Sequence, residues 1–196
     1  MDAPTDPDDP LATLIEGIER HVHPTTLARA ARVELLALDV DGVMTDGGLI
    51  QGDDGLEHKR FHAHDTIGLR LLRESGVRVA VVSGRASETL ANRAREIGVD
   101  ELHQGIDDKA EALAAIVRSS GVAPERCAFL GDDVVDLPPM RRVHLALCPA
   151  DAHPLVRALS HHALARRGGE AAVREAAELL MHAHGTLRAA LAPYLR

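Results

Sequence analysis

The sequence predicts a three-layer α/β fold in which a parallel sheet lies between two layers of helices. Short apolar runs with the length of buried strands alternate along the chain with longer segments of helical periodicity. Such alternation is typical of parallel sheets that helices cover on both faces. The chain has 196 residues, of which 45% are hydrophobic, and this is enough for one domain with its own core.

The composition argues against several classes of protein. The net charge of -8 argues against a nucleic-acid partner, because phosphate backbones attract a surplus of Lys and Arg. No apolar run reaches the roughly 20 residues that a membrane span requires, and the acidic, Pro-rich residues 1–10 are unlike a signal peptide. Cys127 and Cys148 lie in apolar runs, which indicates buried thiols in a cytoplasmic protein with no membrane partner.

Residues 1–32 are expected to contain a tail over about residues 1–10 and a short surface helix over 11–18, where apolar residues recur at helical spacing. A single domain is then expected over residues 33–196. Its first strand is predicted within 34–42, and this apolar segment ends in the two acids Asp39 and Asp41.

The segment 44–61 interrupts the alternation and is predicted to be a β-hairpin flap. Two short runs with strand character, 49–51 and 57–61, flank Asp54-Gly55, a pair that favours hairpin turns because the central residues need positive φ angles. The flap directly follows Asp41. It is therefore expected at the carboxyl edge of the sheet, where open α/β sheets bind their ligands.

The remaining elements continue the alternation. Gly98 and Gly121 each mark the end of a helix, because Gly readily adopts the left-handed conformation that follows a helix. The predicted strands are 77–82, 101–103, 127–130 and 144–147, and the predicted helices are 87–97, 109–119 and an Ala-rich C-terminal helix over 170–191. The expected architecture is a Rossmann-like sheet with one flap.

Four polar clusters lie where a parallel sheet would bring them to one edge. They are Asp39-x-Asp41-Gly42, Ser83-Gly84-Arg85, Lys109 and Gly131-Asp132-Asp133-x-x-Asp136. Carboxylates gathered in a small volume repel one another, and a hard divalent cation that prefers oxygen ligands, Mg²⁺, removes the conflict. With the charge screened, one carboxylate can attack a phosphoryl group, and an acid two residues away can protonate the leaving alkoxide.

The four clusters resemble the four motifs of the haloacid dehalogenase superfamily of phosphohydrolases. Within it, residues 33–182 are similar to the 3-deoxy-D-manno-octulosonate 8-phosphate (KDO 8-phosphate) phosphatases. The similarity lies in the Gly-rich flap, Asp39-x-Asp41-Gly42-Val43-x-Thr45-Asp46-Gly47, Gln104-Gly105-x-x-Asp108-Lys109 and Ala150-Asp151-Ala152-His153-Pro154. The resemblance implies a Mg²⁺-dependent hydrolase of a small phosphorylated sugar acid, of the kind used in lipopolysaccharide biosynthesis.

The resemblance also implies a role for each catalytic residue. Asp39 is the implied nucleophile, which forms an aspartyl-phosphate, and Asp41 is the implied general acid and then the base that activates water. Ser83 and Lys109 are implied to bind the transferring phosphoryl group. The implied Mg²⁺ ligands are Asp39, the backbone carbonyl of Asp41, and Asp132.

Further residues carry less specific roles in the resemblance. Asp136, with Asp133 beside it, is implied to support either the metal site or Lys109. The residues implied to bind substrate are Asp46, Gly47, Asp65, Arg85, Gly169 and Glu170. Asp46 has an alternative interpretation as a turn residue of the flap, and Glu170 as an acid that stabilises the first turn of the helix that follows.

The spacing of the motifs leaves no room for a cap domain. Residues 42–82 accommodate only the flap, one helix and a strand, and residues 83–109 only a helix and a short strand. An uncapped site is open to water, and a neighbouring subunit can supply the missing wall. The chain is therefore expected to form a homo-oligomer, and the family that it resembles forms tetramers.

Two substrates remain open from the sequence. Arg167-Gly168-Gly169-Glu170 resembles the phosphatases of nine-carbon sugar acid 9-phosphates (KDN or N-acylneuraminate), since the eight-carbon enzymes carry a cation where Glu170 stands. His64-Asp65-Thr66 is a second departure from the eight-carbon pattern. The acidic motif over 131–140 and the run over 150–154 favour the eight-carbon enzymes, so KDO 8-phosphate is the expected substrate.

Overall fold

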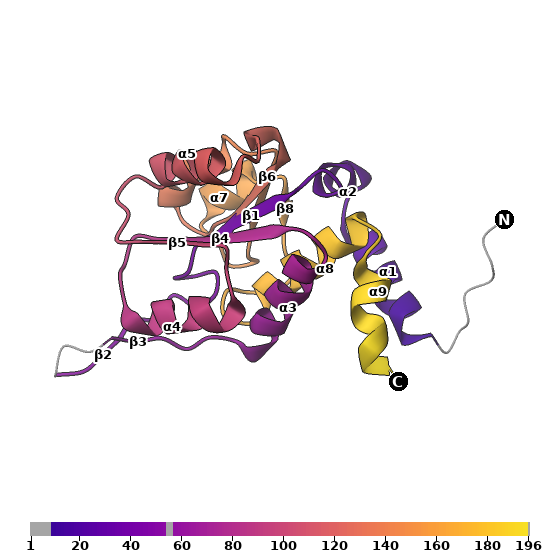
Figure 1. Ribbon diagram of the computed structural model, residues 1–196, viewed down its shortest axis with the longest axis horizontal. Helices are drawn as coiled ribbons and strands as arrows, with labels where there is room; N and C mark the ends of the chain where they lie inside the picture. Colours follow the sequence, from indigo (N-terminus) through magenta and orange to yellow (C-terminus); the bar gives the residue numbers. More distant parts are fainter. Residues whose placement is uncertain (1–8, 54–56, 196) are drawn as a thin grey trace.

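The computed structural model describes residues 9–53 and 57–195. Its main sheet has six parallel strands in the order β5-β4-β1-β6-β7-β8, with β1 near the centre (Figure 1). The strands are β1 (Leu35–Leu38), β4 (Arg78–Ser83), β5 (Glu101–Gln104), β6 (Cys127–Leu130), β7 (Leu145–Cys148) and β8 (His162–Ala163). The predicted parallel α/β sheet is confirmed, and β8 is an additional edge strand.

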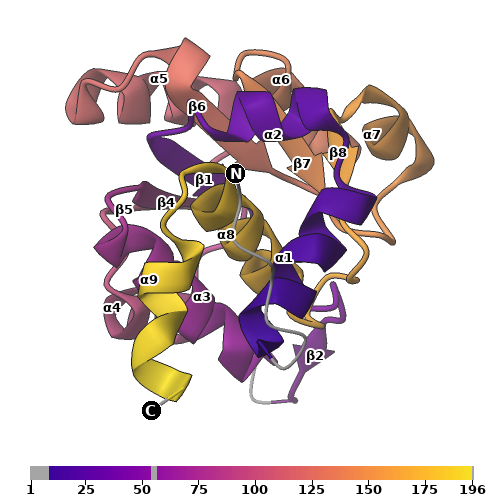
Figure 2. The ribbon, with the colours of Figure 1, turned by 90° about the vertical axis from the view of Figure 1, so that its right-hand side faces the viewer.

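Successive side chains of each strand enter two separate cores, because strand side chains alternate between the faces of a sheet. In β1, Leu36 and Leu38 belong to one core, and Leu35 and Ala37 to the other. Figure 2 shows the two helix layers on either side of the sheet. The first core is covered mainly by α3 (Ala63–Glu74), α4 (Glu88–Ile97) and α8 (Ala172–Ala183), and the second by α5 (Lys109–Ser120), α6 (Leu137–Met140) and α7 (Pro154–Leu159).

The helix boundaries near the carboxyl edge follow from local capping. Ser87 accepts a hydrogen bond from the N–H of Leu90 and so begins α4, and Gly98 ends this helix with a φ angle of 78°. Asp108 accepts bonds from two N–H groups in the first turn of α5, which places Lys109 as its first residue. Capping therefore fixes the position of a charged side chain at the edge of the sheet.

The predicted continuous C-terminal helix over 170–191 is wrong. The structure has α8, which ends at Ala183, and a separate α9 (Leu187–Leu191). Gly185, with a φ angle of 71°, lies between them. The break turns the chain so that Leu187 is buried in the first core, and this burial outweighs the helix propensity of the Ala-rich segment.

The N-terminal segment contains more helix than the sequence predicted. The predicted helix over 11–18 lies within α1 (Pro10–His21), and a second helix, α2 (Pro24–Ala30), follows it. Val22 and Ala30 are buried in the first core, so this segment contributes to the domain's interior. The predicted tail lies mainly over residues 1–8, outside the described residues.

The predicted flap is a two-stranded antiparallel hairpin of β2 (Ile50–Gln51) and β3 (Glu57–His58). Its predicted turn at Asp54-Gly55 lies outside the described residues. Figure 1 shows the hairpin standing out from the body, on the side opposite the two termini. In the described part of the chain, only this hairpin and α3 separate β1 from β4, so no cap domain is inserted there. None of the helices in this part is both long and apolar enough to cross a bilayer.

Candidate active site

The loop after β1 places Asp39 at the base of a pocket. Asp39 is 5% exposed, and its N–H donates to the carbonyl of Leu130 at the end of β6 (3.0 Å). The chain then turns at Gly42, whose φ angle is 90°. A Cβ atom at this position would lie 2.1 Å from Oδ2 of Asp132. Gly42 therefore leaves the room in which the Asp132 side chain lies beside this loop.

Lys109 lies between two buried acids. Its Nζ donates a hydrogen bond to Oδ1 of Asp136 (2.7 Å) and forms an ion pair with Oδ1 of Asp39 (2.9 Å). The other oxygen of Asp136 accepts the N–H groups of Asp132 (3.0 Å) and Asp133 (3.3 Å). Both oxygens of Asp136 are therefore engaged within the protein, and this residue holds Lys109 and the Asp132 loop in place.

The three acids form a group that fits a divalent cation. Carboxylate oxygens of Asp39, Asp132 and Asp136 lie within 4.8 Å of one another. Burial, together with the charge of Asp136, raises the pKa of Asp39 to about 6. Burial and the charges of Asp39 and Asp136 raise the pKa of Asp132 to about 8.

Two of these acids, Asp39 and Asp132, have carboxylate oxygens that remain available to a metal ion. Oδ1 of Asp132 is buried and has no hydrogen-bond partner among the described residues, and a hard cation would compensate its charge. Because both oxygens of Asp136 are engaged, Asp39 and Asp132 are the side chains of this group that fit Mg²⁺.

The end of β4 supplies a hydroxyl and a cation. Ser83 is buried, and its Oγ accepts the N–H of Arg85 (3.2 Å). Arg85 lines the pocket as expected, but its Nη1 donates to Oε2 of Glu57 on the flap (2.9 Å). Arg85 therefore faces both the pocket and the flap.

The pocket has a volume of about 470 Å³ and is bounded by the ends of the central strands, the loop after β1 and the N-terminus of α5. Six residues predicted from the sequence meet in its wall: Asp39, Asp41, Gly47, Arg85, Lys109 and Asp132. These side chains thus meet at the carboxyl edge of the sheet.

Asp46 lies at the base of the flap and is exposed. Its Oδ1 accepts the N–H of Gly48 (3.0 Å), and its Oδ2 pairs with Arg60. These contacts match the interpretation of Asp46 as a turn residue. The structure does not place it in the wall of the pocket.

Asp65 is not brought to the pocket. It is 1% exposed and lies in the first turn of α3, where its Oδ1 accepts the N–H of Arg174 from α8 (2.8 Å). Its Oδ2 is buried without a partner, and burial raises its pKa to about 6. In this chain Asp65 joins two helices, which accounts for its burial without a substrate.

The isosteric replacement Asp65→Asn is expected to stabilise the protein at pH 8 and to have a smaller effect at pH 5. Since the pKa of Asp65 is raised on folding, the folded chain binds more protons than the unfolded chain from about pH 4 to pH 6. The free energy of unfolding therefore falls across this range for Asp65 but not for Asn. The gain at pH 8 is on the order of 1–3 kcal/mol, measured by urea unfolding at both pH values. A difference that does not change with pH would contradict this account.

The loop before α8 supports the catalytic loop of the same chain. A Cβ atom at Gly168 would lie 1.9 Å from the carbonyl oxygen of Gly42, and one at Gly169 would lie 2.5 Å from the backbone nitrogen of Asp46. The N–H of Gly169 donates to the carbonyl of Val43 (3.1 Å). The two glycines thus pack backbone against backbone, and Glu170 follows them as an exposed side chain.

Sequence reasoning missed Lys59, which follows the second strand of the flap. Its side chain is 3% exposed. Its Nζ donates a hydrogen bond to Oδ1 of Asp41 and forms an ion pair with Oε1 of Glu57 (2.9 Å). One signal was available in the sequence. Glu57 and Lys59 are two residues apart, and this spacing places side chains on the same face of an extended strand.

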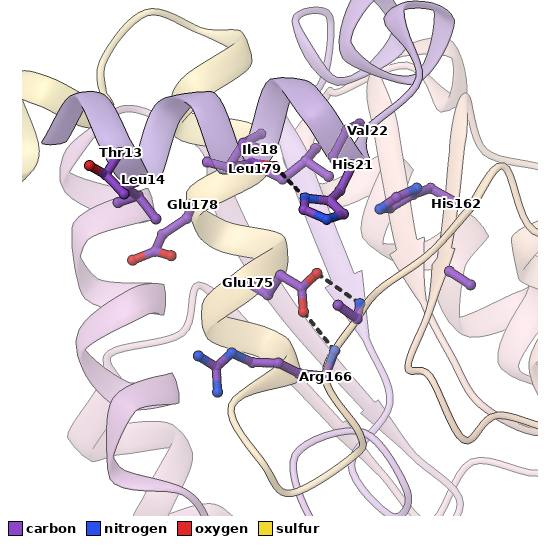
Figure 3. A pocket seen from close by; sticks show the side chains of 13 residues that line it. Thr13, Leu14, Ile18, His21, Val22, His162, Arg166, Glu175, Glu178 and Leu179 are labelled. Atoms are coloured by element: carbon purple, nitrogen blue, oxygen red, sulfur yellow. Dashed lines mark hydrogen bonds between the residues drawn. The ribbon is translucent and has the colours of Figure 1, made fainter. Parts of the chain in front are cut away.

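A second pocket of about 470 Å³ lies between α1 and α8, with Ile18 and Leu179 in its wall (Figure 3). Glu175 accepts two backbone N–H groups of the preceding loop (2.8 Å each), and Glu178 accepts a bond from Arg174 (2.6 Å). Among the described residues, the only acidic cluster of metal-binding geometry lies in the first pocket. The reactive groups therefore belong to the pocket at the sheet edge.

The central strand β1 ends in an acid pair, and a serine, a buried lysine and a second acid pair lie at the same edge of the sheet. This arrangement is typical of the haloacid dehalogenase-like hydrolases. A family model of that description matches residues 66–144. The KDO 8-phosphate phosphatase KdsC of Yersinia pestis is 40% identical over 164 residues, which are 84% of this chain and 88% of the relative. The chain belongs to the KDO 8-phosphate phosphatase family.

Other relatives agree with this assignment. KdsC of Escherichia coli K12 is 38% identical over 161 residues, or 82% of this chain and 86% of the relative. The crystal structure of the Moraxella catarrhalis phosphatase, in complex with magnesium, phosphate and KDO, superposes with a TM-score of 0.85 at 34% identity. That match covers 88% of this chain and 99% of the other. A probable YrbI family phosphatase from Pseudomonas syringae has a TM-score of 0.87 at 39% identity, over 89% and 99% of the two chains.

Proposed function

We propose that this protein is a Mg²⁺-dependent phosphoric monoester hydrolase that converts KDO 8-phosphate to KDO and inorganic phosphate. The observation that carries the proposal is the buried Lys109, held between Asp39 and Asp136 at the base of an open pocket. A cation fixed beside a free carboxylate is what phosphoryl transfer to that carboxylate requires. The names of the relatives supply the substrate.

The reaction proceeds in two steps. An oxygen of Asp39 attacks phosphorus, the bond from phosphorus to the sugar oxygen breaks, and Asp41 gives a proton to the departing alkoxide. Asp41 then takes a proton from water, whose oxygen attacks phosphorus and releases Asp39 and phosphate. Lys109 and Ser83 hold the phosphoryl oxygens throughout. Mg²⁺ held by Asp39, Asp132 and the carbonyl of Asp41 would screen the charge between phosphate and carboxylate.

The proposal includes a cytoplasmic homotetramer in which a neighbouring subunit helps to close the pocket. Two features support an assembly of this kind. The described residues form no cap over the pocket, and the flap exposes the apolar side chains of Leu49 and Ile50. Glu170, exposed beyond the glycine pair, is the residue proposed to distinguish the distal ends of sugar substrates.

The test is phosphate release by the purified protein with Mg²⁺, from KDO 8-phosphate and from the nine-carbon KDN and N-acylneuraminate 9-phosphates. We expect the largest kcat/KM with KDO 8-phosphate, and loss of turnover when EDTA removes the metal. A higher kcat/KM for a nine-carbon ester would instead support the alternative substrate. If the protein hydrolyses neither the eight-carbon nor the nine-carbon esters, the proposed function is wrong. Sedimentation of the same sample is expected to give four times the chain mass of 21.0 kDa.

A further inference from the structure

A chain of charged side chains connects Asp41 to the flap and to the loop after β4. Lys59 donates a hydrogen bond to Oδ1 of Asp41 and forms an ion pair with Oε1 of Glu57 (2.9 Å). The second oxygen of Glu57 accepts a bond from Nη1 of Arg85 (2.9 Å). The four side chains therefore alternate in charge from the catalytic loop, through the flap, to the Ser83 loop.

The burial of Lys59 distinguishes it from an ordinary surface ion pair. Its neighbour Arg60 also joins the flap to the loop after β1, through Asp46, but the side chain of Arg60 is 70% exposed. The ammonium group of Lys59 instead lies between two carboxylates, those of Asp41 and Glu57. A buried ammonium group is costly unless its partners compensate, so this one has a defined position.

The chemistry of the ammonium group determines which oxygen of Asp41 can react. Lys carries three donors and no acceptor, so the oxygen that it contacts must accept. This holds for Oδ1 whether Asp41 is ionised or protonated. The Asp41 side chain is 23% exposed and lines the pocket, which leaves Oδ2 as the oxygen available to a substrate.

We infer that Lys59 is a positioning residue that reserves Oδ1 of Asp41, and so assigns to Oδ2 the proton that passes to the leaving group and later returns from water. Glu57 holds Lys59 in place, and Arg85 holds Glu57. This inference rests on the proposed function, because it concerns the acid and base steps of that hydrolysis. It adds to the reaction a residue of the flap that lies 18 positions beyond Asp41.

The test compares esters that need a proton on the leaving group with esters that do not. The substrates are KDO 8-phosphate and a series of aryl phosphates of increasing leaving-group pKa, from p-nitrophenyl phosphate to phenyl phosphate. The kcat/KM value reports formation of the phosphoenzyme, in which only the proton donation depends on the leaving group. Lys59→Met is expected to lower kcat/KM by about 30-fold or more for KDO 8-phosphate and by less than about threefold for p-nitrophenyl phosphate. Across the aryl phosphates, kcat/KM of Lys59→Met is expected to fall more steeply with leaving-group pKa than that of the wild type.

A second readout follows the base step. If water activation by Asp41 also slows, acid quenching during turnover of p-nitrophenyl phosphate should trap more phosphoenzyme in Lys59→Met than in the wild type. Lys59→Arg keeps a donor and is expected to recover part of the loss with KDO 8-phosphate. The matched control is Arg60→Met, which removes the neighbouring ion pair of the flap and is expected to change all esters alike, by less than about threefold.

The outcomes separate the inference from the proposed function. An equal loss for every ester in Lys59→Met, or no loss, would overturn the positioning role, and so would the same leaving-group selectivity in Arg60→Met. Failure of the wild type to hydrolyse KDO 8-phosphate, with aryl phosphates still turned over, would refute the proposed substrate. The leaving-group slope would still decide the role of Lys59. Thermal melting of each variant shows whether the fold is intact.

Discussion

Replacement of Asp39 by Asn is expected to lower kcat by about 10⁴-fold or more, since an amide cannot form the aspartyl-phosphate. The exchange is isosteric, and it removes one of the negative charges that oppose ionisation of Asp132, so the fold should persist. Phosphate release and acid-quench labelling with radioactive phosphate ester measure the two parts of this prediction. We expect no labelled protein in the variant.

A matched control is available in the first turn of α5. Glu111→Gln makes the same acid-to-amide change close to the site, but Glu111 is exposed and pairs with Arg118 on its own helix. This control should retain wild-type turnover. Near-wild-type hydrolysis by Asp39→Asn, with intact labelling, would refute nucleophilic catalysis by Asp39.

Removal of the cation between the two acids has the second-largest expected effect. Lys109→Met is expected to lower kcat/KM by about 10³-fold, because the phosphoryl group loses its fixed positive partner. It also leaves Asp39 and Asp136 buried and close together without a cation, which costs on the order of 3–5 kcal/mol of the free energy of unfolding.

The loss of stability should depend on pH. Lys109 lowers the pKa of Asp39, so its removal raises that pKa further and the folded variant binds more protons. Stability of the variant therefore falls as pH rises, and the difference from wild type is larger at pH 8 than at pH 5. Urea unfolding in EDTA at the two pH values measures this. Equal losses at both would show that packing, and not charge, accounts for the role of Lys109.

The position of the candidate site followed from the sequence because three of the four polar clusters come directly after an apolar strand. In a parallel sheet the ends of such strands meet at one edge, so Asp39, Ser83 and Asp132 could be brought together without knowledge of the strand order. The helix ends predicted at Gly98 and Gly121 also carried local information that the structure confirms.

Features that depend on contacts distant in sequence were not predicted. The Ala-rich C-terminal segment has the composition of one helix, and Gly in a helix costs only about 1 kcal/mol, so the break at Gly185 is decided by the burial of Leu187. Similarly, nothing in the run around Asp65 showed that it would meet α8, and nothing near Asp41 showed which cation would bond to it.

The close packing of Gly168 and Gly169 on the loop after β1 has a consequence for the order in which the enzyme is made. The four motifs are all synthesised before this glycine pair, yet the backbone that supports Gly42 and Asp46 is incomplete without it. A nascent or truncated chain that ends before residue 168 therefore carries each reactive side chain but lacks the surface on which the nucleophile's loop rests. The ribosome must release that late segment before the earliest motif can become competent for catalysis.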